Sequence, residues 1–101
     1  MKLTKKQQEV VKQFQELSKE HDNKIVINAR LGKAYFWKID SENEIMTTVS
    51  RDPINQRVLN GLDEKGLIQP VDSSFNPLTS DEIQESKYNK NIKFVGAVIN
   101  L

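Results

Sequence analysis

Apolar residues recur at helical spacing near the amino terminus, and charged residues fill many of the positions between them. Four side chains form one apolar stripe: Val10, Val11, Phe14 and Leu17. Thr4 stands before this stretch as an N-cap, and Gln7 completes a capping box three residues later. The lysine and glutamate side chains on the opposite side have the spacing of a solvated helix face. The pattern predicts a helix over Thr4–Lys19.

A second helical stripe lies in the middle of the chain and consists of Ile54, Val58, Leu59 and Leu62. Asp52 is suited to be the N-cap of this helix, and Pro53 suits the first helical position, where a missing N–H costs nothing. Gly66 would end the helix, because glycine adopts the left-handed conformation without a Cβ penalty. The pattern predicts a helix that begins at Pro53 and ends at Gly66.

Two β-rich runs follow the first helix and are typical of a β-hairpin. Lys24–Asn28 and Ala34–Ile39 are joined by the turn Arg30–Lys33, in which Gly32 can take a positive φ. Alternate side chains of the second run would face opposite sides of a sheet. One side would carry Tyr35, Trp37 and Ile39, and the other Ala34, Phe36 and Lys38.

The segment Ile45–Val49 has two interpretations. Its β-branched content favours a third strand. The alternative is a short helix capped by Ser41, with the apolar residues of the segment turned inward. Periodicity over so few residues does not separate strand from helix within residues 41–49, and we favour the strand.

The last third of the chain predicts two more strands separated by a long loop. Leu67–Val71 contains a proline that confines it to a sheet edge or a bulge. Asp72–Asn91 is polar and lacks a sustained period, so it is expected to be mainly loop. Within it, Thr79 and Glu82 can cap one short turn of helix. Ile92–Leu101 is apolar on both faces, as a strand in the interior of a sheet would be.

The composition is that of an ordinary globular protein. The 101 residues fit a single domain over 1–101, with 37% hydrophobic and 29% charged side chains. No run is long enough to span a membrane, and no signal-peptide core follows Met1. The lack of cysteine excludes a disulfide framework and is compatible with a reducing cytoplasm, which is the expected location.

Side chains suited to catalysis or metal binding are sparse. His21 is the only histidine and lies at a polar helix end, where it would be solvated. One histidine without cysteine does not supply an ordinary zinc site. The sequence also has no nucleophile elbow and no phosphate-binding glycine loop. We therefore expect no enzymatic activity, no metal and no cofactor.

Charge is distributed unevenly along the chain. Residues 1–38 carry nine basic and four acidic side chains. Residues 39–85 carry three basic and ten acidic side chains, and residues 86–101 carry three basic side chains and no acidic ones. The net charge of +1 therefore conceals basic ends and an acidic middle. Such a chain presents two electrostatic faces where the fold segregates these segments.

The stretch VLNGLDEKGLI resembles the recognition helix and first wing strand of winged helix-turn-helix domains. The residues that carry the resemblance are Val58, Leu59, Leu62, Lys65, Gly66, Leu67 and Ile68. It implies a small α+β, winged-helix-like domain with two main helices, an antiparallel sheet and a long wing loop over about residues 72–91. The chain departs from the family pattern because a β-hairpin stands in place of, or is inserted before, the second helix.

The resemblance also implies a small, transcription-regulator-like protein that binds double-stranded DNA. Family members that bind DNA place the outer face of this helix in the major groove, where amides pair with adenine and guanidinium groups with guanine. On that face Gln56, Asn60 and Glu64 lie opposite the apolar stripe, and Arg57 and Asp63 flank them. The side chains expected to read bases are Gln56, Arg57 and Asn60. Phosphates would be neutralised by Arg51, Arg30, Lys33, Lys87, Lys90 and Lys93.

A protein-binding module or inhibitor on the same scaffold is the alternative, because a fold alone does not decide function. The acidic middle of the chain favours this alternative, since DNA affinity depends on phosphate neutralisation. Its docking surface would use the outer helix face or the aromatic strand, through Tyr35, Trp37, Asn60 and Glu64. A homodimer is compatible with both functions, and no membrane partner is expected.

Overall fold

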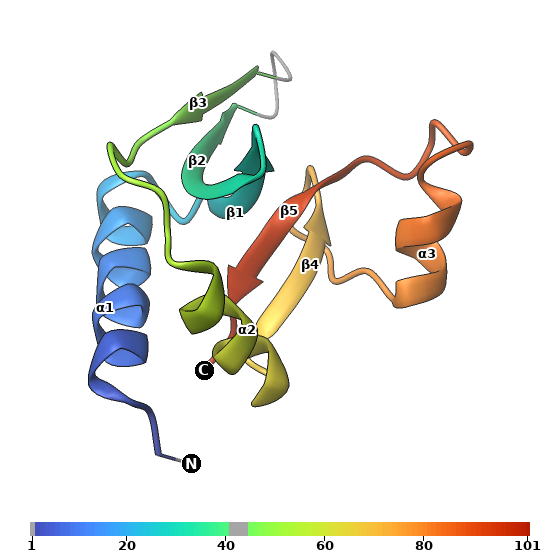
Figure 1. Cartoon of the computed structure of the whole chain (residues 1–101). Coiled ribbons are helices and arrows are strands. Elements are labelled where there is room, and N and C mark those ends of the chain that lie inside the picture. The colour runs from blue at the N-terminus through green and yellow to red at the C-terminus, as the bar shows by residue number, and fades with distance from the viewer. Residues whose placement is uncertain (1, 41–44) are drawn as a thin grey trace.

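The computed structural model describes residues 2–40 and 45–101. Its elements are α1 (Lys5–Glu20), β1 (Ile25–Arg30), β2 (Lys33–Asp40), β3 (Ile45–Thr48), α2 (Gln56–Glu64), β4 (Ile68–Asp72), α3 (Ser80–Glu85) and β5 (Phe94–Ile99). The strands form an antiparallel sheet in the order β3-β2-β1-β5-β4 (Figure 1). The predicted class, a small α+β fold, is confirmed.

Two helices begin at the capping boxes that the sequence predicts. Thr4 Oγ1 accepts from the Gln7 N–H at 3.2 Å, and Gln7 Oε1 accepts from the Thr4 N–H at 3.0 Å. Thr79 and Glu82 make the same reciprocal pair at the start of α3. Each box satisfies two amides that the first turn of a helix would leave without partners. The segment after β4, expected to be mainly loop, therefore holds a helix of six residues.

The predicted hairpin is confirmed and corresponds to β1 and β2. The ladder runs from the pair Ile25 and Lys38 to the pair Arg30 and Lys33. Between them, Leu31 and Gly32 have φ values of 52° and 77°. A two-residue turn with positive φ at both positions has the twist that the flanking strands require.

The favoured interpretation of the third segment is also confirmed, because Ile45–Thr48 is strand β3 and pairs with β2. Ser41, the cap of the alternative helix, lies outside the described residues. Beyond Thr48 the chain continues alongside β2, where the Val49 N–H donates to Phe36 O at 3.0 Å.

The predicted start of the central helix is wrong by three residues. Ile54 is still paired with β2, and its N–H donates to Ala34 O at 2.7 Å. This long-range bridge holds the chain extended through Pro53, so α2 begins at Gln56. Asn55, and not Asp52, is the N-cap, and its side chain accepts from the Arg57 N–H at 2.9 Å. The predicted stop is confirmed by Gly66, which has a φ of 73°.

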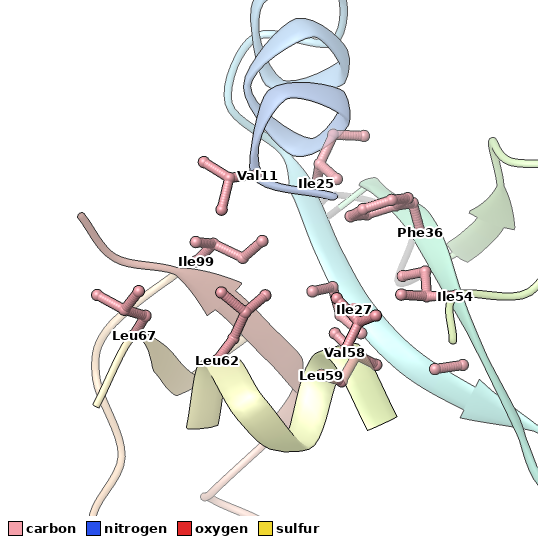
Figure 2. Close-up of a cluster of buried hydrophobic side chains, with 11 residues drawn as sticks. Val11, Ile25, Ile27, Phe36, Ile54, Val58, Leu59, Leu62, Leu67 and Ile99 are labelled. Carbon is pink, nitrogen blue, oxygen red and sulfur yellow. The ribbon is translucent and has the colours of Figure 1, made fainter. Parts of the chain in front are cut away.

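The main core lies between the sheet and the two longer helices, on what we call the covered face (Figure 2). Leu62 and Phe36 are fully buried there, and the Phe14 and Phe36 rings are 6.2 Å apart. The predicted burial of Leu62 is confirmed. The other buried members are Val11, Ile25, Ile27, Ala34, Ile54, Val58, Leu59, Leu67 and Ile99.

The helices cross closely at Gly61, a glycine in the interior of α2. A Cβ at this position would overlap Nε2 of Gln7 on α1. Gln7 is only 7% exposed, and its Oε1 also accepts from Lys65 Nζ at 2.6 Å. Gly61 therefore leaves room for the buried Gln7 side chain, and this polar side chain marks the crossing.

The opposite side of the sheet, which we call the open face, has a smaller apolar cluster. Val26, Ile39 and Val71 are buried in it, and half-buried Trp37 and Phe75 pack against them. The predicted split of β2 is confirmed, since Ala34 and Phe36 belong to the covered face. β5 lies between β1 and β4, as its apolar pattern predicts, and β4 is an edge strand whose register with β5 shifts between Val71 and Asp72.

Candidate functional site

The exposed side of α2 carries three polar side chains near the amino-terminal end of the helix. Gln56, Arg57 and Asn60 are all exposed. Gln56 and Asn60 lie one turn apart, and Gln56 Nε2 donates to Asn60 Oδ1 at 3.0 Å. Both amides thus face solvent together and can instead bond to an external partner, because the bond between them is itself exposed.

A groove of about 460 Å³ separates the first turn of α1 from the first turns of α2. It is lined by Thr4, Lys5, Lys6, Gln7, Arg57 and Val58. Lys5 and Lys6 belong to the helix whose charged side the sequence assigned to solvent, so they were not among the predicted site residues. The tertiary crossing of the helices, which the sequence does not reveal, brings them next to Arg57.

The charged side chains of this groove are basic, although helix amino termini usually carry acidic ones. A helix amino terminus carries a partial positive charge and is stabilised by acidic side chains in its first turn. Neither α1 nor α2 has an acidic residue in its first turn. Lys5, Lys6 and Arg57 instead add full positive charges at these positions, so the groove is a favourable environment for anions.

The β1–β2 turn carries two further cations, whose side chains belong to the open face by the alternation along β1 and β2. The antiparallel bridge between Ala34 and Ile54 places Lys33 opposite Asn55, the N-cap of α2. Lys33 is the register partner of Arg30, and both side chains are exposed. We call Lys5, Lys6 and Arg57 the basic stripe, because all three line the groove at the amino-terminal end of α2.

The remaining predicted basic residues lie at different distances from this stripe. Arg51 is exposed in the bend that precedes α2. Lys93 comes directly before β5, at the end of the sheet where the β1–β2 turn lies, because β1 and β5 are antiparallel through Ile27 and Ala97. Lys87 and Lys90 are exposed in the segment between α3 and β5, which stands well apart from α2 in Figure 1.

Acidic side chains lie toward the other end of α2. Asp63 and Glu64 are exposed in its last turn, after Arg57 and Asn60. The helix is therefore divided along its length, with cations around its first turns and carboxylates at its last. An anionic ligand would be attracted to the first turns and repelled from the last.

The four residues of the alternative protein-binding surface are split between the two faces of the sheet. Tyr35 and Trp37 belong to the open face and are half-buried, and Trp37 Nε1 donates to Asn28 O at 3.0 Å. Asn60 and Glu64 lie on α2, which packs on the covered face. The structure thus brings together the DNA-binding candidates of α2, but not these four residues.

Metal-binding groups and membrane-spanning helices are both absent from the described part of the chain. No group of three or more His, Asp or Glu side chains lies close enough to hold a metal ion among residues 2–40 and 45–101. None of the helices in those same ranges has the length and apolar character that crossing a bilayer requires. No family model, curated protein or solved structure matches this chain.

Proposed function

We propose that this protein binds double-stranded DNA through the amino-terminal half of α2, which would enter the major groove. The observation that supports the proposal is the basic stripe, whose three cations come from α1 and α2 and line one groove beside the first turns of α2. Phosphate neutralisation supplies most of the sequence-independent affinity for DNA, so cations beside a reading helix are the expected arrangement.

The proposed division of roles follows from where each side chain lies. Gln56 and Asn60 present adjacent amides on the exposed side of α2, and either amide can pair with the N6 and N7 edge of adenine after their mutual bond breaks. Lys5 and Lys6 would hold phosphates beside α2, and Arg51, Lys33 and Arg30 remain proposed phosphate contacts farther from the reading face. Arg57 lines the same groove as Lys5 and Lys6, so the prediction that it reads guanine competes with a phosphate contact.

The carboxylates of α2 are compatible with this mode because of their position. Recognition helices contact base edges mainly through their amino-terminal residues, and the rest of the helix rises out of the groove. Asp63 and Glu64, in the last turn, would then lie outside the groove. Lys87, Lys90 and Lys93 remain proposed phosphate contacts of the wing segment, and the cytoplasm remains the proposed compartment.

The test is a binding titration of the protein against a randomised duplex pool at two salt concentrations. Replacing Lys5 and Lys6 together by Ala should weaken binding to all sequences alike and lower the salt slope by about two units. Arg57→Ala should reduce sequence preference by about 1–3 kcal/mol at one base position if Arg57 reads guanine, and uniformly weaken binding if it holds phosphate.

A matched control removes the same charge elsewhere. Lys19→Ala with Lys24→Ala deletes two exposed lysines, of which Lys19 lies about 20 Å along the axis of α1 from Lys5 and Lys24 follows the helix, just before β1. This variant should retain the salt slope of the unmodified protein. If no duplex binds below about 10 μM at low salt, DNA binding is excluded, and the protein-binding alternative takes its place.

A further inference from the structure

The two edge strands of the sheet, β4 and β3, differ in whether other parts of the chain cover their outer side. Along β4, the chain folds back so that Asn76–Leu78 covers the outer side of the strand. The Asp72 N–H donates to Asn76 O at 3.0 Å, and the Leu78 N–H donates to Pro70 O at 2.9 Å. A proline interrupts the same strand. These features prevent a further strand from pairing with β4.

β3 forms the other edge and has none of these features. The strand reads Ile45-Met46-Thr47-Thr48, without proline, glycine or charge. In Figure 1 it lies at the outer side of the sheet with no other described element alongside it. An edge strand that lacks charge, proline and cover is a site for pairing with another strand.

The direction of the backbone groups shows which residues of β3 are available. The Val49 N–H donates to Phe36 O at 3.0 Å, so the backbone of Val49 faces β2. Backbone direction alternates along a strand, so Thr47 faces β2 in the same way, and Met46 and Thr48 point their N–H and C=O groups away from the sheet.

We infer that two copies of this chain pair through β3 in an antiparallel arrangement centred on Thr47. In this register Met46 of one copy lies opposite Thr48 of the other, and each such pair exchanges two backbone hydrogen bonds, about four in all. The arrangement is self-complementary because Met46 and Thr48 are equally spaced about Thr47. An isologous contact of this kind closes with two copies and leaves no further edge to propagate.

The side chains of β3 are compatible with this register. Thr47 of one copy lies beside Thr47 of the other, and facing threonines are a favourable cross-strand pair. On the open face, Met46 packs against the same small cluster as Trp37. The second copy would place its Thr48 beside Met46 and its Met46 beside Thr48, and so extend this apolar row across the contact.

A two-fold axis of this type is perpendicular to the sheet, so the helices of both copies lie on the same side. Two α2 helices would then be presented together, which is how dimeric regulators read palindromic sites. This consequence rests on the proposed DNA binding. The pairing itself does not, because it is measured without DNA and DNA binding is measured separately on a monomeric variant.

The experiment is sedimentation equilibrium of the full chain from about 20 μM to about 1 mM. The contact is smaller than a standard interface, so we expect a dissociation constant of about 10–500 μM. The average mass should rise from 11.6 kDa toward twice that value across this range. A mass that stays at 11.6 kDa throughout would overturn the inference.

Two substitutions at one position locate the contact. Thr48→Pro removes the outward N–H without breaking the ladder with β2, whereas Thr48→Val retains that N–H. The Pro variant should be monomeric, and the Val variant should associate like the unmodified chain. Association that survives in the folded Pro variant places the contact elsewhere and contradicts the inference.

A third variant covers the case in which Thr48→Pro fails to fold, which far-ultraviolet circular dichroism would reveal. Met46→Lys places two ammonium groups diagonally across the two-fold axis, where they repel each other. It should raise the dissociation constant at least about tenfold at low salt and recover partly at high salt. Unchanged association of this variant would also contradict the pairing through β3.

Discussion

The covered and open faces of the sheet bury very different amounts of apolar surface. The covered face holds eleven buried hydrophobic side chains under α1 and α2, whereas the open face holds Val26, Ile39 and Val71. Burial of apolar area is the main favourable term in folding, so most of the stability must come from the covered face. The open face and its β3 edge are therefore less constrained by folding and remain available for contacts with other molecules.

The strongest test of this comparison is Leu62→Ala, at the centre of the covered face. Leu62 has no exposed area, and a cavity left by its truncation is closed in by α1 and the sheet. We expect a loss of about 2–5 kcal/mol in the free energy of unfolding, measured by urea titration. Leu31→Ala is the control, because Leu31 is 93% exposed and should change stability by less than about 0.5 kcal/mol.

Gly61→Ala tests the crossing of the helices at the buried Gln7 side chain. Alanine is favoured over glycine in a helix by about 1 kcal/mol, so propensity alone would stabilise the variant. A Cβ here meets Gln7 instead, and we expect a net loss of about 1–3 kcal/mol from overpacking. Asn60→Ala, one residue earlier and exposed, should gain a few tenths of a kcal/mol at most. A stabilised Gly61→Ala would show that the Gln7 side chain moves aside at little cost.

The smallest expected effect is the difference in stability cost between one Ile→Val substitution on the covered face and one on the open face. Ile25 is 1% exposed under α1, and Ile39 is 2% exposed on the open face. Ile25→Val and Ile39→Val should each cost about 0.5–1.5 kcal/mol, with the larger cost at Ile25 because the open face can relax into the space. Equal or reversed costs in parallel urea titrations would mean that the open face is packed as firmly as the covered one.

Local patterns explain which parts of the fold were predictable. The capping boxes at Thr4 and Thr79, the hairpin turn at Gly32 and the stop at Gly66 each depend on residues within a few positions of one another. Such short-range chemistry is fully present in the sequence. The start of α2 was not predictable from short-range chemistry. Asp52 and Pro53 suit a helix start, but the bridge between Ile54 and Ala34, twenty residues earlier, holds this segment extended.

The residues of the candidate site also fall into two groups, those predictable from the local sequence and those that depend on tertiary packing. Gln56, Arg57 and Asn60 follow from the helix wheel, since Gln56 and Asn60 lie opposite an apolar stripe and Arg57 flanks them. The position of Lys5 and Lys6 beside Arg57 depends on how α1 crosses α2, and the spacing of residues in the sequence does not predict this crossing. One signal was nevertheless available, because two lysines without an acidic residue in a first helical turn run against the helix dipole.

The position of β5 has a consequence for how the chain folds during synthesis. β5 pairs with β1 through Ile27 and Ala97, roughly seventy residues apart, and its other neighbour β4 is bonded to it along its whole length. While the ribosome is still producing β5, β4 has no strand in the sheet to pair with. The hairpin and β3 can assemble early, but the core under α2 can close only after the last strand leaves the exit tunnel.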